Sequence, residues 1–236
     1  DNVNVRKALN LSLDRNVITD KVLGQGQTPT YVFTPTYIEE GQLIQQPAYS
    51  KEPMAQRNEE AIKLLEEAGY SKANPLKFSI LYNTNENHKK VAIAAASMWK
   101  ANTKGLIDVK LENQEWKTYI DSRRAGRYDA ARAGWNADYN QATTFGNYFL
   151  SNSSNNTAKY ANPEYDKAIA ESYVATDAEG RAKAYAKAEE ILAKDFGIVP
   201  IFNYVNPRLV KPYVKGYSGK DPQDHIYLRN LYIIKH

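Results

Sequence analysis

The sequence predicts an α/β fold in which strands and helices alternate and part of the sheet is parallel. Residues 75–84 alternate apolar and polar side chains, the pattern of a half-buried strand, and 107–113 is a second strand-like stretch. Two helical segments, 88–101 and 116–124, follow these strands. A helix between two strands favours a parallel pair, because the helix carries the chain back to the starting edge of the sheet.

The first 70 residues are expected to form helices on either side of one long loop. Apolar spacing predicts a helix over 5–15, and a second short helix over 17–23 ends before Gly24. Residues 28–53 contain four prolines and are predicted to form an extended loop over the surface. Residues 58–70 combine helical periodicity, a Glu–Lys pair four residues apart and a glycine near the end, which predicts a helix.

The remaining chain continues the alternation and then becomes helical. Further elements are expected as a strand over 127–134, helices over 141–150, 163–175 and 178–194, and a strand over 197–205. The tail from Asn206 is rich in proline and glycine. It ends in NLYIIKH, a strand-like stretch with nothing after it to pair with.

Composition excludes several classes of protein. The net charge of +4 is small and spread along the chain, so nucleic acid is not expected as a partner. The longest apolar stretch, VAIAAASMW, is far below the roughly 20 residues that span a bilayer. The absence of cysteine excludes disulfides and thiolate chemistry. The 18 tyrosines against 6 phenylalanines suit a wet recognition surface, or reflect composition alone.

The sequence contains no coherent catalytic constellation. The three histidines lie far apart, so no metal site is expected. The glycine pair before Gln27 lacks the third glycine of a dinucleotide fingerprint, and no phosphate loop or nucleophile elbow occurs. Adjacent carboxylates lie on helices beside lysines, as on a solvated face. These observations favour a binding protein without a cofactor over an enzyme.

One short segment, ARAGWNADYN, concentrates opposite charges around a large aromatic side chain. It places Arg132, Trp135 and Asp138 among glycine and small residues. In one interpretation Arg132 and Asp138 form a structural ion pair beside a buried Trp135. In the other, the segment is a pocket wall that offers both charges to a ligand with two charged ends.

Three long strings carry a resemblance to a known family. They are NQEWKTYIDSRRAGRYDAARAGWNADYN, LSNSSNNTAKYANPEYD and VNPRLVKPYVKGYSGKDPQDHIYLRNLYIIKH, and they resemble the C-terminal half of periplasmic oligopeptide-binding proteins. These are the solute-binding components of bacterial peptide ABC transporters, two-lobed proteins of the type II, peptide- and nickel-binding class. The resemblance implies a C-terminal peptide-binding lobe over 1–203. It also implies a crossover segment over 204–236 that returns to an N-terminal lobe absent from this sequence.

The resemblance also implies roles for individual charged residues. Asp138 matches the aspartate that binds the peptide's α-ammonium group, and Arg132 matches an arginine that binds the C-terminal carboxylate. Arg123 and His88 match pocket residues that place the carboxylates of peptides of different length. Charges fixed at both ends orient a zwitterionic peptide without reading its side chains.

The uncharged site residues follow from the same resemblance. Trp116 and Trp135 match tryptophans that wall the side-chain pockets, and Gly134 matches a glycine that lets the peptide backbone approach. Asn136 belongs to the same segment, but close relatives carry a cysteine there, and this chain cannot form the bridge that such a cysteine makes. Without the resemblance, both tryptophans are interpreted as core residues, as is Trp99 on its helix.

The predicted function is peptide binding in the periplasm, with a membrane permease as partner. Murein peptides are an alternative ligand, because a branch of the family binds them. A hydrolase that uses Asp138 as base is an alternative from another class, and a structural or adhesive surface domain is a third. Turnover of peptide would distinguish the hydrolase. A melting temperature that does not respond to peptide would distinguish the structural domain.

Overall fold

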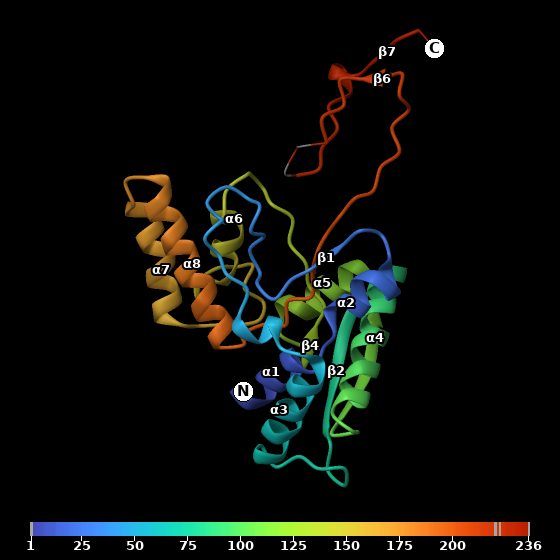
Figure 1. Ribbon diagram of the computed structural model, residues 1–236, viewed down its shortest axis with the longest axis vertical. Coiled ribbons are helices and arrows are strands. Elements are labelled where there is room, and N and C mark those ends of the chain that lie inside the picture. The colour runs from blue at the N-terminus through green and yellow to red at the C-terminus, as the bar shows by residue number, and fades with distance from the viewer. Residues whose placement is uncertain (1, 220, 222, 236) are drawn as a thin grey trace.

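A parallel sheet forms the centre of the larger packed unit in the computed structural model, which describes residues 2–219, 221 and 223–235. Strand β2 (Leu76–Asn83) lies between β3 (Ile107–Gln114) and β4 (Ala130–Ala131), and both neighbours run parallel to it. The predicted α/β alternation is therefore confirmed (Figure 1). The strand expected over 127–134 is much shorter, because only its middle pairs with β2.

Three helices cover this sheet and bury its apolar side chains. They are α1 (Val3–Leu11), α3 (Met54–Glu67) and α4 (Glu86–Asn102). A further helix, α5 (Trp116–Arg124), follows β3. The shared core includes Ala8, Leu11, Ala61, Leu65, Ile80, Val91, Trp99 and Ile107. The core position predicted for Trp99 is confirmed: it is 6% exposed, and its indole N–H donates to the Leu9 carbonyl.

A second apolar cluster lies under the helices of the C-terminal half. Helices α7 (Pro163–Val174) and α8 (Ala178–Lys194) form an antiparallel pair, which is the orange pair in Figure 1. Each begins at a side-chain cap, Asn162 for α7 and Asp177 for α8. The helix expected over 141–150 is only a short α6 (Thr143–Gly146) followed by a 3-10 turn (Asn147–Phe149). Aromatic side chains of this stretch turn inward to pack on α7 and α8.

The N-terminal helix ends earlier than its apolar pattern predicts. Helix α1 stops at Leu11, α2 (Arg15–Val17) begins at the Asp14 cap, and a π-helix (Ile18–Leu23) ends at left-handed Gly24. The reason is Arg15, which is fully buried and donates to the carbonyls of Asn10, Leu13 and Pro200. A buried guanidinium needs such acceptors. In a continuous helix the carbonyls of Asn10 and Leu13 would instead accept backbone hydrogen bonds of the helix.

The proline-rich stretch 28–53 is not the surface loop that was predicted. It contains β1 (Thr28–Pro29) and a 3-10 turn (Ala48–Lys51), and Val32, Ile38 and Ile44 are buried. Its prolines prevent a regular helix, but its apolar side chains still pack inward. Strand β1 pairs antiparallel with β5 (Phe202–Asn203), the short remainder of the strand expected over 197–205.

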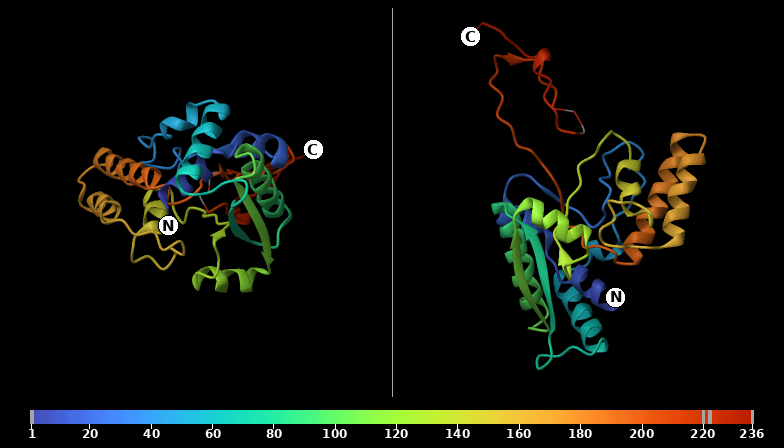
Figure 2. Two further views of the ribbon diagram at one scale, coloured as in Figure 1. Left: turned by 90° about the horizontal axis from the view of Figure 1, so that it is seen from below. Right: turned by 180° about the vertical axis from the view of Figure 1, so that it is seen from behind.

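The tail forms a hairpin of its own that projects from the body (Figures 1 and 2). Strand β6 (Val214–Lys215) pairs antiparallel with β7 (Tyr232–Ile233), after a 3-10 turn (Leu228–Asn230). The expectation that NLYIIKH has no partner strand is therefore wrong. A preceding segment of the tail, which carries no strong strand pattern, folds back onto it.

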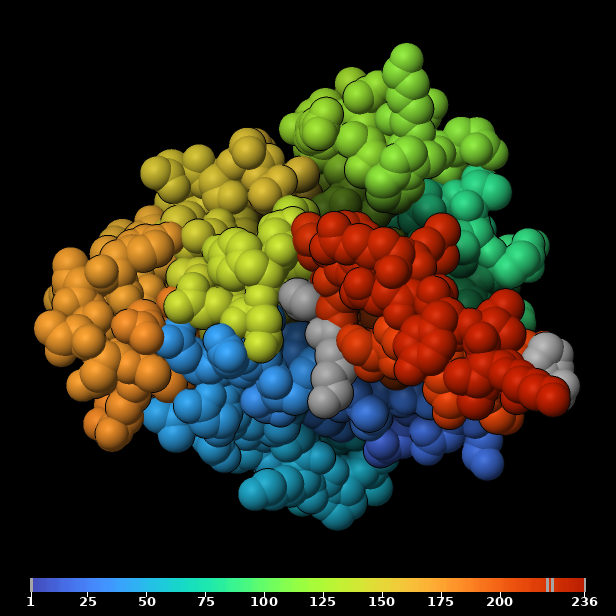
Figure 3. Space-filling view, turned by 90° about the horizontal axis from the view of Figure 1, so that it is seen from above, coloured from blue at the N-terminus to red at the C-terminus, as the bar shows by residue number. Residues whose placement is uncertain are grey.

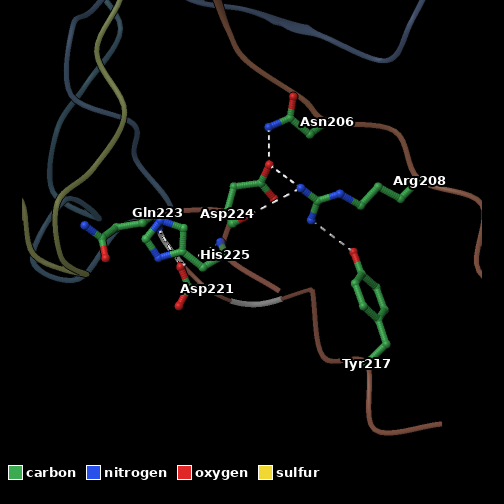
Figure 4. Close-up of polar contacts among 7 residues, drawn as sticks. All are labelled: Asn206, Arg208, Tyr217, Asp221, Gln223, Asp224 and His225. Atoms are coloured by element: carbon green, nitrogen blue, oxygen red, sulfur yellow. Dashed lines mark hydrogen bonds and ion pairs between the residues drawn. The ribbon is translucent and has the colours of Figure 1, made fainter. Parts of the chain in front are cut away.

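Side-chain contacts hold the two arms of the tail together. The Asp224 carboxylate accepts hydrogen bonds from Arg208, at 2.6 Å, and from Asn206 (Figure 4). Asp221 accepts from the backbone N–H groups of Gln223 and His225, which shapes the loop between the arms. The predicted division of the chain at 203/204 stays a prediction.

Candidate functional site

The predicted site residues follow the carboxyl ends of the three parallel strands. His88 lies in the first turn of α4 after β2, Trp116 begins α5 after β3, and Arg132 directly follows β4. The Arg132 backbone N–H donates to the Leu81 carbonyl at 2.8 Å, which extends the pairing of β4 with β2. Ligands of open α/β sheets bind at this edge, where loops leave the strands. Figure 3 looks onto the face reached by these loops.

Arg123, Arg132 and His88 form a positive cluster at this edge. Burial and then the charge of Arg132 lower the pKa of His88 to about 4. Burial also lowers the pKa of Arg132, and the charge of Arg123 lowers it further. Within the described part of the chain, no carboxylate forms an ion pair with any of the three. The positive charge of the cluster therefore comes from the two arginines, beside a neutral His88, and no acid compensates it.

Tyrosines support the two arginines in place of carboxylates. Arg123 Nη2 donates to the Tyr148 hydroxyl and to Thr157 Oγ1, both at 2.9 Å. Burial lowers the pKa of Arg123, but Tyr119 and Tyr148 outweigh it and raise the pKa. The Tyr119 hydroxyl donates to the Arg132 carbonyl. Sequence reasoning missed these supporting residues, and the high tyrosine content was the only signal for them.

Asp138 lies at the far end of the same segment and does not pair with Arg132. It is exposed, and its Oδ2 accepts from Thr144 Oγ1 at 3.2 Å. Among the described residues, none donates to Oδ1. The structural ion pair between Arg132 and Asp138, one of the two interpretations, is therefore wrong for this structure. One carboxylate oxygen remains open to a ligand.

The two site tryptophans differ in burial. Trp135 is half-buried and packs edge-on against Tyr148, with ring centroids 5.0 Å apart. Trp116 is 59% exposed and lies over Tyr119, with centroids 5.7 Å apart. The alternative that Trp116 is a core residue is wrong, whereas Trp135 belongs to the edge of the second apolar cluster.

Gly134 and Asn136 flank Trp135 and are both exposed. A Cβ at Gly134 would collide with the hydroxyl of Tyr204, the first residue after β5. The same tyrosine ring lies 5.6 Å from the Arg132 guanidinium carbon. Gly134 is thus required for the packing of Tyr204, and its role toward a ligand stays a prediction. Among the described residues, none forms a hydrogen bond with the Asn136 side chain.

Three buried nitrogen atoms of the predicted site residues lack hydrogen-bond partners among the described residues. They are Nε of Arg123, Nδ1 of His88 and Nε1 of Trp135. Buried polar groups are normally paired, and each exception calls for a water, an ion or a ligand. These three atoms come from three of the predicted site residues, which favours a ligand with several acceptor atoms.

The chain is similar to bacterial solute-binding proteins. The family described as bacterial extracellular solute-binding proteins, family 5 Middle, matches residues 1–157. The chain belongs to this family. Family 5 relatives include the periplasmic oligopeptide-binding protein OppA of Haemophilus influenzae, 97% identical over 236 residues, and OppA of Salmonella typhimurium, 54% identical. The chain is covered completely in both comparisons and spans 44% and 43% of these relatives.

Solved family 5 structures confirm the predicted fold class. Haemophilus influenzae OppA in complex with RPPGFSPFR has a TM-score of 0.93 at 96% identity, over all of this chain and 46% of that one. The murein tripeptide-binding protein MppA of Escherichia coli has a TM-score of 0.89 at 44% identity, over 100% of this chain and 46% of that one. The fold is that of a lobe of a type II periplasmic binding protein.

No helix in the described ranges is long and apolar enough to cross a membrane. The described residues contain no group of three or more histidine, cysteine, aspartate or glutamate side chains placed to bind a metal ion. The relatives are solute-binding proteins by family and by name.

Proposed function

We propose that this chain is the ligand-binding lobe of a periplasmic protein that captures short peptides by their charged termini. Arg123, Arg132 and His88 bind the C-terminal carboxylate, and Asp138 binds the α-ammonium group. Trp116 and Trp135 line the pockets for peptide side chains, beside Gly134 and Asn136. An opposing lobe closes over the peptide, and a membrane permease of an ABC transporter receives it.

The uncompensated positive cluster carries this proposal. Burying the Arg132 guanidinium without an anion is unfavourable, and Tyr119 only partly offsets the cost. A ligand carboxylate would supply both the missing charge and acceptors for the unpaired nitrogens of Arg123 and His88. The open oxygen of Asp138, on the same segment as Arg132, suits the opposite end of a zwitterion.

The relatives favour ordinary peptides over the alternatives. The oligopeptide-binding relatives reach 97% and 54% identity, whereas the murein peptide-binding relative reaches 45%. Among the described residues Asp138 contacts Thr144 and no histidine, so binding is favoured over hydrolysis. We therefore expect peptide to be recovered intact after incubation, and a murein tripeptide to compete weakly.

Capping the two ends of one peptide tests the proposal. Calorimetry on a two-lobed protein that contains this chain would compare a tripeptide in free, N-acetylated and C-amidated forms. Each cap removes one charge, and we expect each to weaken binding by about 2–5 kcal/mol, as when a desolvated pair loses one partner. If both capped forms bound like the free peptide, recognition by charged termini would be contradicted.

His88 gives a pH dependence whose sign follows from its surroundings. Its pKa of about 4 leaves the imidazole neutral in the ligand-free protein at neutral pH. A bound carboxylate favours the imidazolium and raises this pKa in the complex. The added affinity is present below the raised pKa and is lost as pH rises through it. We expect tighter binding at about pH 5 than at about pH 8.

This effect should be confined to peptides whose carboxylate reaches His88. Calorimetry with di- to pentapeptides would compare the unmodified protein with His88→Ala, which should lose the pH dependence for those lengths. His225→Ala is the matched control, because His225 lies in the tail hairpin. Equal losses in His88→Ala for peptides of every length would argue against a role in length selection.

A further inference from the structure

Glu40 joins three segments that are distant in the sequence. Its side chain is only 9% exposed. Oε1 accepts from Arg181 Nε of α8 at 2.5 Å, and Oε2 accepts from Gln141 Nε2 at 2.9 Å. Both carboxylate oxygens are therefore bound to fixed donors. The contact ties α8 to the segment that carries Asp138.

Gln141 passes this constraint to Asp138. The Gln141 carbonyl accepts from the Thr144 N–H at 3.2 Å. Thr144 Oγ1 accepts from the Asp138 N–H at 3.0 Å and donates to Asp138 Oδ2 at 3.2 Å. The backbone adds a second link, because the Ala142 N–H donates to the Glu39 carbonyl at 2.9 Å. The turn from 138 to 144 is thus held at its middle by Glu40 and at its ends by Thr144.

The backbone of Glu40 is strained where these contacts meet. Its φ of 63° lies in the left-handed region, which a glutamate rarely adopts. Such a conformation persists only where the surrounding contacts fix it, and it often marks a functional site. Arg181 also neutralises the Glu40 charge, since the two side chains form an ion pair. Asp138 is then the acid left open on this turn for a ligand cation.

We propose that Glu40, together with Arg181 and Gln141, is a positioning group for Asp138, a role that rests on the proposed function. The group fixes where the Asp138 carboxylate stands relative to the positive cluster of Arg123, Arg132 and His88. It thereby sets the selectivity for peptides with a free α-ammonium group. If these contacts are lost, Asp138 keeps its negative charge, but its carboxylate is no longer held in one position. Its contact with the peptide ammonium group is then weaker.

Two variants test the proposal in the two-lobed protein. Gln141→Leu cuts the link to Glu40 and leaves the ion pair with Arg181, and Glu40→Gln removes the charge itself. Calorimetry would measure a tightly bound free peptide and its N-acetylated form. We expect each variant to weaken the free peptide about tenfold, the size of a coupling between residues in one network, and to leave the acetylated form unchanged. In an Asp138→Asn background, neither variant should cause a further loss.

The matched control is Glu171→Gln, which removes another ion pair of α8, the one with Lys187 at 3.1 Å. It should change neither affinity. Thermal unfolding, followed by circular dichroism, would show whether each variant folds. If Glu40→Gln does not fold, the result for Gln141→Leu decides the test. Equal losses for the free and acetylated peptides, or no loss for either, would overturn the positioning role. If Asp138→Asn itself had no effect, the proposed ammonium site would fail instead.

Discussion

Asp138→Asn is expected to weaken the binding of free peptides by about 2–5 kcal/mol in the two-lobed protein. The carboxylate has one oxygen without a partner among the described residues, and closure of a second lobe would remove water from it. Asparagine keeps the size and the contact with Thr144 but loses the charge. Calorimetry with a free tripeptide measures the loss directly.

Asp129→Asn is the control for this variant. Asp129 precedes β4, whereas Asp138 follows it, and its carboxylate accepts from the N–H and hydroxyl of Ser79. It carries the same charge at the opposite end of the strand, so its loss should leave peptide affinity unchanged. An unchanged affinity in Asp138→Asn as well would mean that the ammonium group is bound elsewhere.

The chain by itself is expected to bind peptides with a Kd of about a millimolar or weaker. Asp138, Gly134 and Trp116 are exposed, so a peptide on this lobe alone would remain largely in water. A charge pair in that setting contributes only about 0–1 kcal/mol. Titration of the isolated chain followed by calorimetry tests this expectation. Micromolar affinity would show that one lobe is a complete binding module, contrary to the proposed two-lobed mechanism.

The tail should also make the isolated chain self-associate. Leu209, Leu228 and Ile233 are 105%, 76% and 69% exposed on a hairpin that projects from the body (Figure 2). An apolar surface of this kind tends to recruit another chain. Light scattering should detect dimers, and a chain that ends at Asn203 should remain monomeric. A monomeric full chain would contradict this expectation.

The sequence alone determined the elements whose signals are local. Helices α7 and α8 follow periodicity and begin at Asn162 and Asp177, because a cap acts on the turn directly after it. The strand–helix order determined the parallel sheet. It also placed His88, Trp116 and Arg132 directly after strands, and thus at one edge. The predicted fold class and family needed no tertiary information.

Only the tertiary structure decided which distant side chains meet. The early end of α1 depends on Arg15 reaching the carbonyl of Pro200, far along the chain. The support of Arg123 by Tyr148, and of Gln141 by Glu40, likewise joins separate segments. No periodicity encodes such pairs, because a hydrogen bond between distant residues depends on how whole elements pack. The same packing separates Arg132 from Asp138, which sequence proximity alone left free to pair.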